Sequence, residues 1–177
     1  MTGDQESTCG EPRAERLRTS VDGLELRALH ELDAFAYHAL VRRNDEHLTR
    51  FGDYTDEVAA TTQQHRRELA ERDSVPLRFG ILLGGELIGR ADLVAVAPPA
   101  YGLGFWLGAD AIGRGLATAA VSALLGHARV TLGATDIYAG VTHGNDKSAA
   151  LLERVGFRFA QRFEDYTRYH LHLGVGA

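Results

Sequence analysis

The stretch of residues 104–141 constrains the fold most, because it joins a strand pattern, a glycine turn, a helix pattern and a second strand pattern. An apolar run at 104–107 leads to Gly113-Arg114-Gly115, and the residues from 117 to 131 then place apolar side chains on one helical face. In residues 136–141 apolar side chains alternate with others, as in a strand that is buried on one side. This order predicts a βαβ unit, and therefore a fold that combines helices with a sheet.

Residues 79–83 and 86–95 predict two antiparallel strands joined by the two-residue turn Gly84-Gly85. Glycine supplies the positive φ angles that the primed hairpin turns require. Pro98-Pro99 ends the second strand, and residues 101–107 supply a third. The three strands predict a β-meander that leads directly into the βαβ unit.

The remaining segments predict two helices before the meander and a short helix with two strands after the βαβ unit. Residues 30–48 have the spacing of one amphipathic helix, and residues 55–72, rich in Gln, Arg and Glu, predict a mostly solvated second helix. Residues 147–155 predict a short helix, because Gly156 suits the left-handed position that follows many helices. A hairpin or a strand is expected at 21–27, and strands are expected at 157–163 and 166–173.

Length and composition bound the class of protein. The 177 residues predict one domain at 17–177 after a flexible tail at 1–16, and the net charge of −5 without a basic block argues against general nucleic-acid binding. Cys9 is the only cysteine, which excludes an intrachain disulfide and indicates a reducing compartment. No signal peptide or membrane segment is recognisable, since the longest uncharged stretch contains Pro98 and Pro99, so we expect a cytoplasmic protein.

The glycine turn before the predicted helix at 117–131 is a candidate anion site. The first turn of a helix has unpaired N–H groups and a positive dipole end, and glycines let a phosphate approach closely. A tight turn without a ligand is the alternative. A dinucleotide fingerprint would need a third glycine where the chain has Thr118, and its acidic residue would lie at the far end of the strand that Asp136 begins. A P-loop motif is absent from the sequence.

Four motifs together resemble the GNAT acetyltransferases, and within them the RimJ/RimL-like group. They are Phe105-Trp106-Leu107-Gly108, the turn and helix start at 113–118, Asn145-x-x-Ser148, and the ending Leu152-Glu153-x-x-Gly156-Phe157. Residues 42–48 also resemble the helix end that precedes the substrate loop of this group. The resemblance covers residues 17–173.

The resemblance implies an α/β (α+β) GNAT fold, in which helices flank a mixed, mostly antiparallel sheet and a splayed pair of strands holds acetyl-CoA. It also implies transfer of the acetyl group to a primary amine, either a protein or peptide N-terminus or a small molecule such as an antibiotic or a polyamine. A noncatalytic acyl-CoA-binding regulatory module and an acyltransferase for a longer chain are the alternatives. The oligomeric state is expected to be a monomer or a homodimer.

The resemblance also implies which residues bind the cofactor. The backbone amides at 113–118, helped by the Arg114 side chain, would hold the pyrophosphate, and a backbone N–H near Leu107 would face the thioester carbonyl. Ile112 stands where the family pattern has a polar residue. The full cofactor set comprises Phe105, Trp106, Leu107, Ile112, Gly113, Arg114, Gly115, Leu116, Ala117, Thr118, Asn145 and Ser148.

Candidate catalytic residues are Ser148, Asp92 and His143. By the resemblance, Ser148 would be the general acid for the departing thiolate, although a serine in the first turn of a helix needs no such role. Asn145 would bond the pantetheine arm or simply cap the helix. Asp92 lies in an otherwise apolar strand and would face the cleft as a base or occupy a solvated position, and His143 would relay a proton or be merely exposed.

Candidate acceptor-binding residues are Phe51, Asp53, Tyr54 and Glu57. Asp53 and Glu57 would attract a cationic amine, although ordinary solvated acids would look the same. The group often has Trp and Pro in this loop, so the acceptor is open. We expect no metal, because His170 and His172 share a strand face without an evident third ligand.

Overall fold

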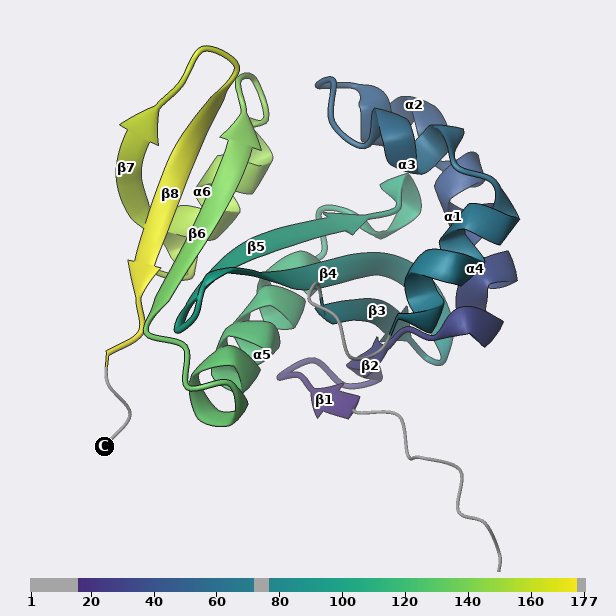
Figure 1. The fold of residues 1–177 in the computed structure, drawn as a ribbon, viewed down its shortest axis with the longest axis horizontal. Coiled ribbons are helices and arrows are strands. Elements are labelled where there is room, and N and C mark those ends of the chain that lie inside the picture. Colours follow the sequence, from purple (N-terminus) through teal and green to yellow (C-terminus); the bar gives the residue numbers. More distant parts are fainter. Residues whose placement is uncertain (1–15, 72–76, 175–177) are drawn as a thin grey trace, which may run out of the picture.

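The computed structural model describes residues 16–71 and 77–174, which form an eight-stranded sheet with helices on both faces (Figure 1). The strand order is β1-β2-β3-β4-β5-β6-β8-β7, and the pairing is antiparallel except between β5 and β6. The strands are β1 (Arg16–Arg18), β2 (Leu24–Ala28), β3 (Leu77–Leu83), β4 (Glu86–Ala97), β5 (Ala100–Leu107), β6 (Asp136–Thr142), β7 (Arg158–Arg162) and β8 (Tyr166–His172). The expected mixed, mostly antiparallel sheet is confirmed.

The helices divide between the two faces of the sheet (Figure 1). They are α1 (Ala34–Arg43), α2 (Asp45–Thr49), α3 (Thr55–Ala59), α4 (Thr62–Ala70), α5 (Leu116–Thr131) and α6 (Asp146–Arg154), with short 3-10 turns at Glu31–Asp33 and Ala109–Ala111. The larger apolar core joins α5 and α6 to the sheet, and the smaller one packs α1, α2 and α4 around Trp106. Because side chains alternate along a strand, Trp106 faces the second core while its neighbour Leu107 belongs to the first.

Strands β5 and β6 are paired only at their beginning. The parallel register runs from Ala100 opposite Asp136 to Gly102 opposite Tyr138, and the strands then diverge (Figure 1). From Leu103 onward, β5 has β4 as its only partner strand in the described chain. The expected splayed pair is therefore present, and it leaves one edge of β5 open toward the space between the two halves of the sheet.

The local turn predictions are confirmed. Gly84 and Gly85 have φ angles of 58° and 87° and connect β3 to β4, and Gly156 has a φ angle of 102° after α6. Pro98-Pro99 lies between β4 and β5, as expected from the loss of a strand donor at proline. Glycine is needed at these positive φ angles because a β-carbon would be strained there.

The prediction of one helix at 30–48 is wrong, because the chain bends at Asn44. The Asn44 side-chain amide donates to the carbonyl oxygen of Leu40 at 2.9 Å, and its oxygen accepts from Ala109 N–H at 2.8 Å. Helix α1 ends before this residue and α2 begins after it. Leu32 and Phe35, counted among the apolar positions of the predicted helix, are 77% and 78% exposed.

The second predicted helix, at 55–72, is also two helices. Its break falls at Ala60 and Thr61, where the Thr61 hydroxyl accepts from Gln64 N–H and the Gln64 side chain accepts from Thr61 N–H. This capping box starts a new helix at Thr62. Most of α4 is exposed as expected, but His65 and Leu69 are buried.

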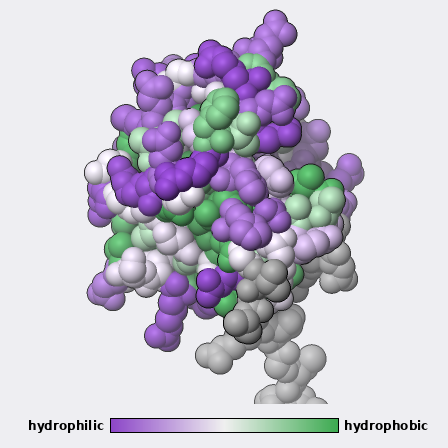
Figure 2. Space-filling view, turned by 90° about the vertical axis from the view of Figure 1, so that its left-hand side faces the viewer, coloured by the Kyte–Doolittle hydropathy of each residue, from purple (hydrophilic) through white to green (hydrophobic). Residues whose placement is uncertain are grey.

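The side of the molecule that carries β7 and β8 is mostly hydrophilic, with scattered hydrophobic residues (Figure 2). All residues of β7 are exposed. Within the described residues no helix is long and apolar enough to cross a membrane. The predicted tail lies outside the described residues except for Arg16, which begins β1.

Candidate active site

A cavity of about 740 Å³ opens where β5 and β6 diverge. Its walls come from α2 and the loop to α3, from the end of β5, from the turn before α5 and from the start of α6. Most of the predicted site residues line it: Phe51, Asp53, Tyr54, Phe105, Trp106, Leu107, Ile112, Gly113, Gly115, Leu116, Ala117, Thr118, Asn145 and Ser148. The cavity therefore joins the predicted cofactor segments to the loop that was predicted to bind the acceptor.

The glycine turn presents a helix N-terminus to this cavity. Gly113 and Gly115 have φ angles of 77° and 75°, and Gly115 precedes the 16-residue helix α5. The first intrahelical bond runs from Ala119 N–H to the Gly115 carbonyl, so the N–H groups before it have no helical partner. Arg154 of α6 also lines the cavity and reaches the Thr118 hydroxyl at 3.4 Å. A helix N-terminus with a nearby cation is suited to a phosphate.

At the start of α6, Asn145 and Ser148 lie side by side. The Asn145 side-chain oxygen accepts from Ser148 N–H at 3.3 Å, so Asn145 is the N-cap of this helix. The Ser148 hydroxyl forms no hydrogen bond with any described residue. It is therefore free to donate a proton into the cavity.

Side chains from the α1–α3 segment hold the open edge of β5. Gly108 N–H bonds the Ile88 carbonyl of β4, and since backbone groups alternate along a strand, those of Phe105 and Leu107 face away from β4. We find two of their carbonyls occupied, because Tyr54 donates its hydroxyl to Phe105 O at 3.2 Å and His47 Nε2 lies 3.1 Å from Leu107 O. The N–H groups of the same two residues lie on the side that β6 leaves open.

Asp53 connects the loop between α2 and α3 to the other half of the sheet. The Thr142 hydroxyl, at the end of β6, donates to Asp53 Oδ1 at 2.6 Å. Tyr54 follows in a left-handed conformation with a φ angle of 55°, and burial raises the pKa of its phenol well above the ordinary value. Tyr54 thus keeps its proton and remains a donor to β5.

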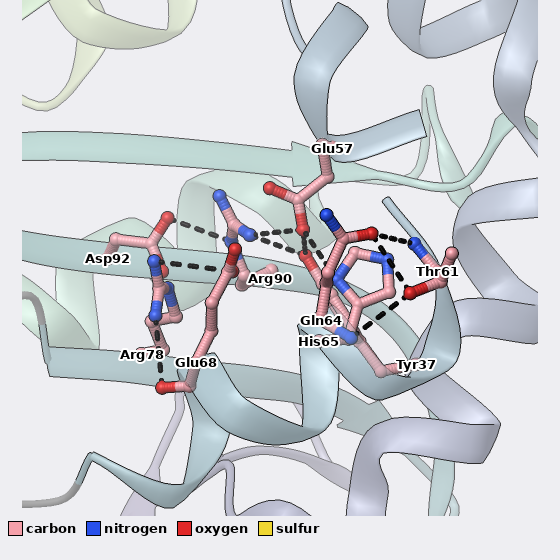
Figure 3. A network of polar contacts seen from close by, with 9 residues as sticks. All are labelled: Tyr37, Glu57, Thr61, Gln64, His65, Glu68, Arg78, Arg90 and Asp92. Carbon is pink, nitrogen blue, oxygen red and sulfur yellow. Dashed lines mark hydrogen bonds and ion pairs between the residues drawn. The ribbon is translucent and has the colours of Figure 1, made fainter. Parts of the chain in front are cut away.

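Two of the predicted site residues lie instead in a buried polar network beneath α1, α3 and α4 (Figure 3). Arg90 of β4 is its centre, with NH1 at 2.7 Å from Glu57 Oε1 and Nε at 2.8 Å from Asp92 Oδ2. The Tyr37 hydroxyl accepts from Arg90 and donates to Glu57. His65 packs edge-on against Tyr37, with its Nδ1 3.8 Å from Glu57.

The charged groups of this network are largely shielded from solvent and act mainly on one another. Burial opposes the charge of Arg90, but Asp92, Tyr37 and Glu57 hold its pKa well above the ordinary value. Burial likewise opposes ionisation of Glu57, yet Arg90 and Tyr37 keep its pKa below the ordinary value. Burial raises the pKa of Asp92 despite the charge of Arg90. The network fastens α1 and α3 to β4, and neither Glu57 nor Asp92 lines the cavity.

The remaining predicted residues also lie apart from the cavity lining. Arg114 is exposed on the glycine turn but is not in the lining, and His143 has a half-buried ring whose Nε2 lacks a hydrogen-bond partner among the described residues. The roles of Arg114 and His143 stay predictions. The sequence analysis did not single out two residues of the lining, Arg154 and His47, the latter lying within the run 42–48.

The histidine pair on β8 is hydrogen-bonded to Asp136 at the start of β6. Asp136 Oδ1 lies 2.7 Å from His170 Nε2 and 3.2 Å from His172 Nδ1. Hydrogen bonds from Thr135, His170 and His172 lower the pKa of Asp136 to about 2. No group of three or more His, Cys, Asp or Glu side chains in the described chain is arranged to hold a metal ion.

Comparison with known proteins gives one family and many similar folds. The sequence profile of the acetyltransferase (GNAT) domain matches residues 23–158. No curated protein sequence matches the chain. The solved structure of the ribosomal L7/L12 α-N-protein acetyltransferase RimL in complex with coenzyme A has a TM-score of 0.78 and 21% identity, covering 89% of this chain and 98% of that one.

Two further solved structures are similar at the same level. The ribosomal-protein-S5-alanine acetyltransferase from Vibrio fischeri has a TM-score of 0.77 and 18% identity, with 86% of this chain and 94% of that one covered. Mycobacterium smegmatis RimJ in complex with CoA-disulfide has a TM-score of 0.70 and 23% identity, with 90% and 87% covered. At these identities the likeness establishes the fold.

Proposed function

This chain belongs to the GNAT acetyltransferase family, and on that premise we propose that it acetylates the primary amine of a protein or peptide N-terminus or of a small molecule. It is an N-acetyltransferase that uses acetyl-CoA as its co-substrate. The observation that carries the proposal is the continuous cavity between the anion-binding turn and the loop at Asp53. One end of the cavity suits a pyrophosphate and the other suits an amine that carries a positive charge before it reacts.

The donor binds along the open edge of β5. The N–H groups at the start of α5 hold the pyrophosphate, Arg154 contributes a positive charge, and the pantetheine arm lies between β5 and β6. The backbone N–H of Leu107 faces the thioester carbonyl and stabilises the oxyanion that forms when the amine attacks. The tetrahedral intermediate then collapses, and the Ser148 hydroxyl gives its proton to the departing thiolate.

The acceptor enters beside the loop between α2 and α3. Asp53 lines the cavity, and its Oδ1 is already engaged by Thr142, so Oδ2 is the oxygen available to a cationic amine. Two of the similar structures are named for acetylation of ribosomal proteins, which favours a protein N-terminus among the acceptors to be tried. The microcin C7 self-immunity acetyltransferase MccE, bound to acetyl-CoA and AMP, has the same fold at a TM-score of 0.72 and keeps small molecules in the panel.

The proposal includes a cytoplasmic, reducing location and a monomeric or homodimeric state. The single cysteine supports the first, and a net charge of −5 fits an enzyme that has no nucleic-acid partner. Size-exclusion chromatography with light scattering measures the oligomeric state.

The decisive experiment is release of free thiol from acetyl-CoA, measured across N-terminal peptides, polyamines and aminoglycosides. We expect turnover with at least one amine class and slower turnover with longer acyl-CoAs. Binding of CoA without thiol release for any acceptor would contradict the proposal and favour a regulatory module. Faster transfer from a longer acyl-CoA would show that the acetyl group is not the preferred cargo.

Ser148→Ala tests the proposed general acid within the same assay. We expect kcat to fall about 10-fold to 100-fold while the Kd for CoA changes little, because the hydroxyl acts on the leaving thiolate. Ser122→Ala, on the exposed face of α5, is the matched control and should change neither value. An unchanged kcat in Ser148→Ala would remove the hydroxyl from the mechanism.

A further inference from the structure

His47 stands out among the histidines because its ring reaches the reactive end of the cavity. Of the eight histidines, all of which lie in the described residues, only His47 lines the cavity. The residue lies in the short helix α2, which is held on one side by the buried Leu48 and begins at the bend fixed by Asn44. Its ring position is thus set by packing and by hydrogen bonds.

The contact of His47 with Leu107 sets which ring nitrogen carries the proton. Nε2 lies 3.1 Å from the Leu107 carbonyl oxygen, which can only accept a hydrogen bond. In the neutral ring Nε2 must then hold the hydrogen, and Nδ1 keeps a free lone pair. No described residue forms a hydrogen bond to Nδ1. The ring is therefore a base whose basic atom is unoccupied.

The hydrogen bond to the Leu107 carbonyl oxygen also places the His47 ring near the site of acetyl transfer. The Leu107 N–H and C=O point to the same side of β5, and this N–H is the group that faces the thioester carbonyl in the proposed reaction. A ring that bonds the C=O of the same residue lies next to the carbonyl carbon that the amine attacks.

The other candidate bases are less suitably placed. Asp92 is buried in its ion pair with Arg90, and neither Asp92 nor His143 lines the cavity. Asp146 lines it but is exposed at the start of α6. Asp53 also lines it, with one oxygen bonded to Thr142, and is the rival that the experiment must separate from His47.

We propose that His47 is the general base of the acetyl transfer. The amine nitrogen forms a bond to the thioester carbon, its surplus proton passes to His47 Nδ1, and the carbon–sulfur bond breaks as the thiolate takes a proton from Ser148. The imidazolium then returns its proton to water and the Ser148 alkoxide takes one back from water, so the net products are the amide and the CoA thiol. This inference rests on the proposed function and assigns the group that accepts the proton of the acceptor.

The test compares His47→Gln with the wild-type enzyme. Glutamine places an amide N–H near the position of Nε2 and keeps the hydrogen bond to Leu107, but it is not a base. We expect kcat to fall about 100-fold or more, with the Kd for CoA within about 2-fold, because general bases contribute on that scale. A structural role alone predicts that His47→Gln keeps its activity, which would overturn the proposal.

Two further variants make the test specific. His47→Ala removes the ring, and added imidazole should restore part of its turnover but none in Ser148→Ala. Asp53→Asn should mainly raise KM for cationic acceptors. If Asp53→Asn loses kcat while His47→Gln retains it, the base is Asp53 and the proposal is wrong.

A readout without turnover separates this inference from the proposed function. The imidazole ¹⁵N chemical shifts of His47 should show the Nε2–H tautomer in the neutral free enzyme, and the Nδ1–H tautomer would overturn the proposal. Thiol release by the wild-type enzyme at a rate that His47→Gln matches would refute the inference alone. Absence of release with every acceptor would refute the proposed function, and the inference would fall with it.

Discussion

Replacing Arg90 by methionine should destabilise the fold strongly, because Arg90 forms ion pairs with two buried carboxylates, those of Glu57 and Asp92 (Figure 3). Methionine fills a similar length with an apolar chain and leaves Glu57 and Asp92 without their ion pairs. The Tyr37 hydroxyl also loses a donor. The substitution thus tests whether this network fastens the acceptor-side helices to the sheet.

The size of the effect follows from burial. The side chains of Arg90, Glu57 and Asp92 are 8%, 13% and 9% exposed, so solvent screens the charges poorly. Removing one partner of a buried ion pair costs about 3–5 kcal/mol, since the remaining charge is left desolvated. The free energy of unfolding of a domain is about 5–15 kcal/mol, so Arg90→Met should fold at low temperature with a small margin.

Urea unfolding followed by circular dichroism and by the fluorescence of Trp106, the single tryptophan, gives this free energy. Arg16→Met is the matched control, because it removes the same kind of side chain from the exposed pair with Glu25, whose partners are 55% and 29% exposed. Arg16→Met should lower the free energy of unfolding by less than about 1 kcal/mol. An equally small loss of unfolding free energy in Arg90→Met would show that the buried ion pairs do not stabilise the fold.

The pH dependence of stability tests independently whether Arg90 stabilises the ionised carboxylates. In the wild-type protein the pKa of Glu57 is lowered, so its contribution to stability is present above its unfolded value and is lost as the pH falls through the lower folded value. Without Arg90, burial raises the pKa of both carboxyls, and protonation then favours the folded state. Arg78 opposite Asp92 and His65 beside Glu57 remain in place. The stability gap between the two proteins should therefore narrow as the pH falls from 7 to about 4, and a constant gap would contradict this account.

Other substitutions test the strands and the bend. Gly89→Ala should lower the free energy of unfolding by about 1–3 kcal/mol, because a β-carbon there would lie 2.3 Å from the Trp106 carbonyl oxygen and force β4 from β5. Gly126→Ala on α5 is the contrasting change. Its β-carbon would meet nothing within 4 Å, and it should raise the free energy of unfolding by about 0.5–1 kcal/mol. Asn44→Ala should cost about 1–3 kcal/mol, because Ala109 N–H loses its acceptor, and equal urea midpoints for this variant and the wild type would contradict that role.

The sequence predicted the parts of the fold that local chemistry determines. The hairpin at Gly84-Gly85, the stop at Pro98-Pro99 and the glycine turn before α5 each depend on backbone preferences of the residues themselves. The glycine turn and the start of α6 are likewise contiguous motifs, and both line the cavity, whereas cofactor binding by them stays a prediction.

The buried network could not be read from the chain, because its members are far apart in sequence and only packing makes them a unit. Tyr37 and Glu57 are separated by 20 positions, and Tyr37 and Arg90 by 53. Arg90 and Asp92, alternating in an apolar strand, were the available signal, since two charges on one face of a buried strand require partners. Glu57 gave no such signal, because an acid at the start of a helix is ordinary.

The wrong helix at 30–48 has a related cause. Its apolar spacing continued through Asn44, while the reason for the bend lies 65 residues away at Ala109. The apolar side chains of Leu32 and Phe35 satisfied the periodicity without being buried, and Tyr37 occupies the inner face beside Leu40. Periodicity identifies an amphipathic segment, but tertiary contacts decide where it bends and which face packs.

The acceptor-side segment has two tasks that fall on different residues, and this division limits how acceptor preference can change. Asn44, His47 and Tyr54 each bond the backbone of β5 or the turn after it, so replacing them disturbs the donor strand as well. Phe51 and Asp53 line the cavity without a bond to β5. Substitutions of Phe51 or Asp53 should therefore alter KM for the amine while the Kd for CoA stays constant. Tyr54→Phe should raise both KM for the amine and Kd for CoA, because it loosens the edge of β5.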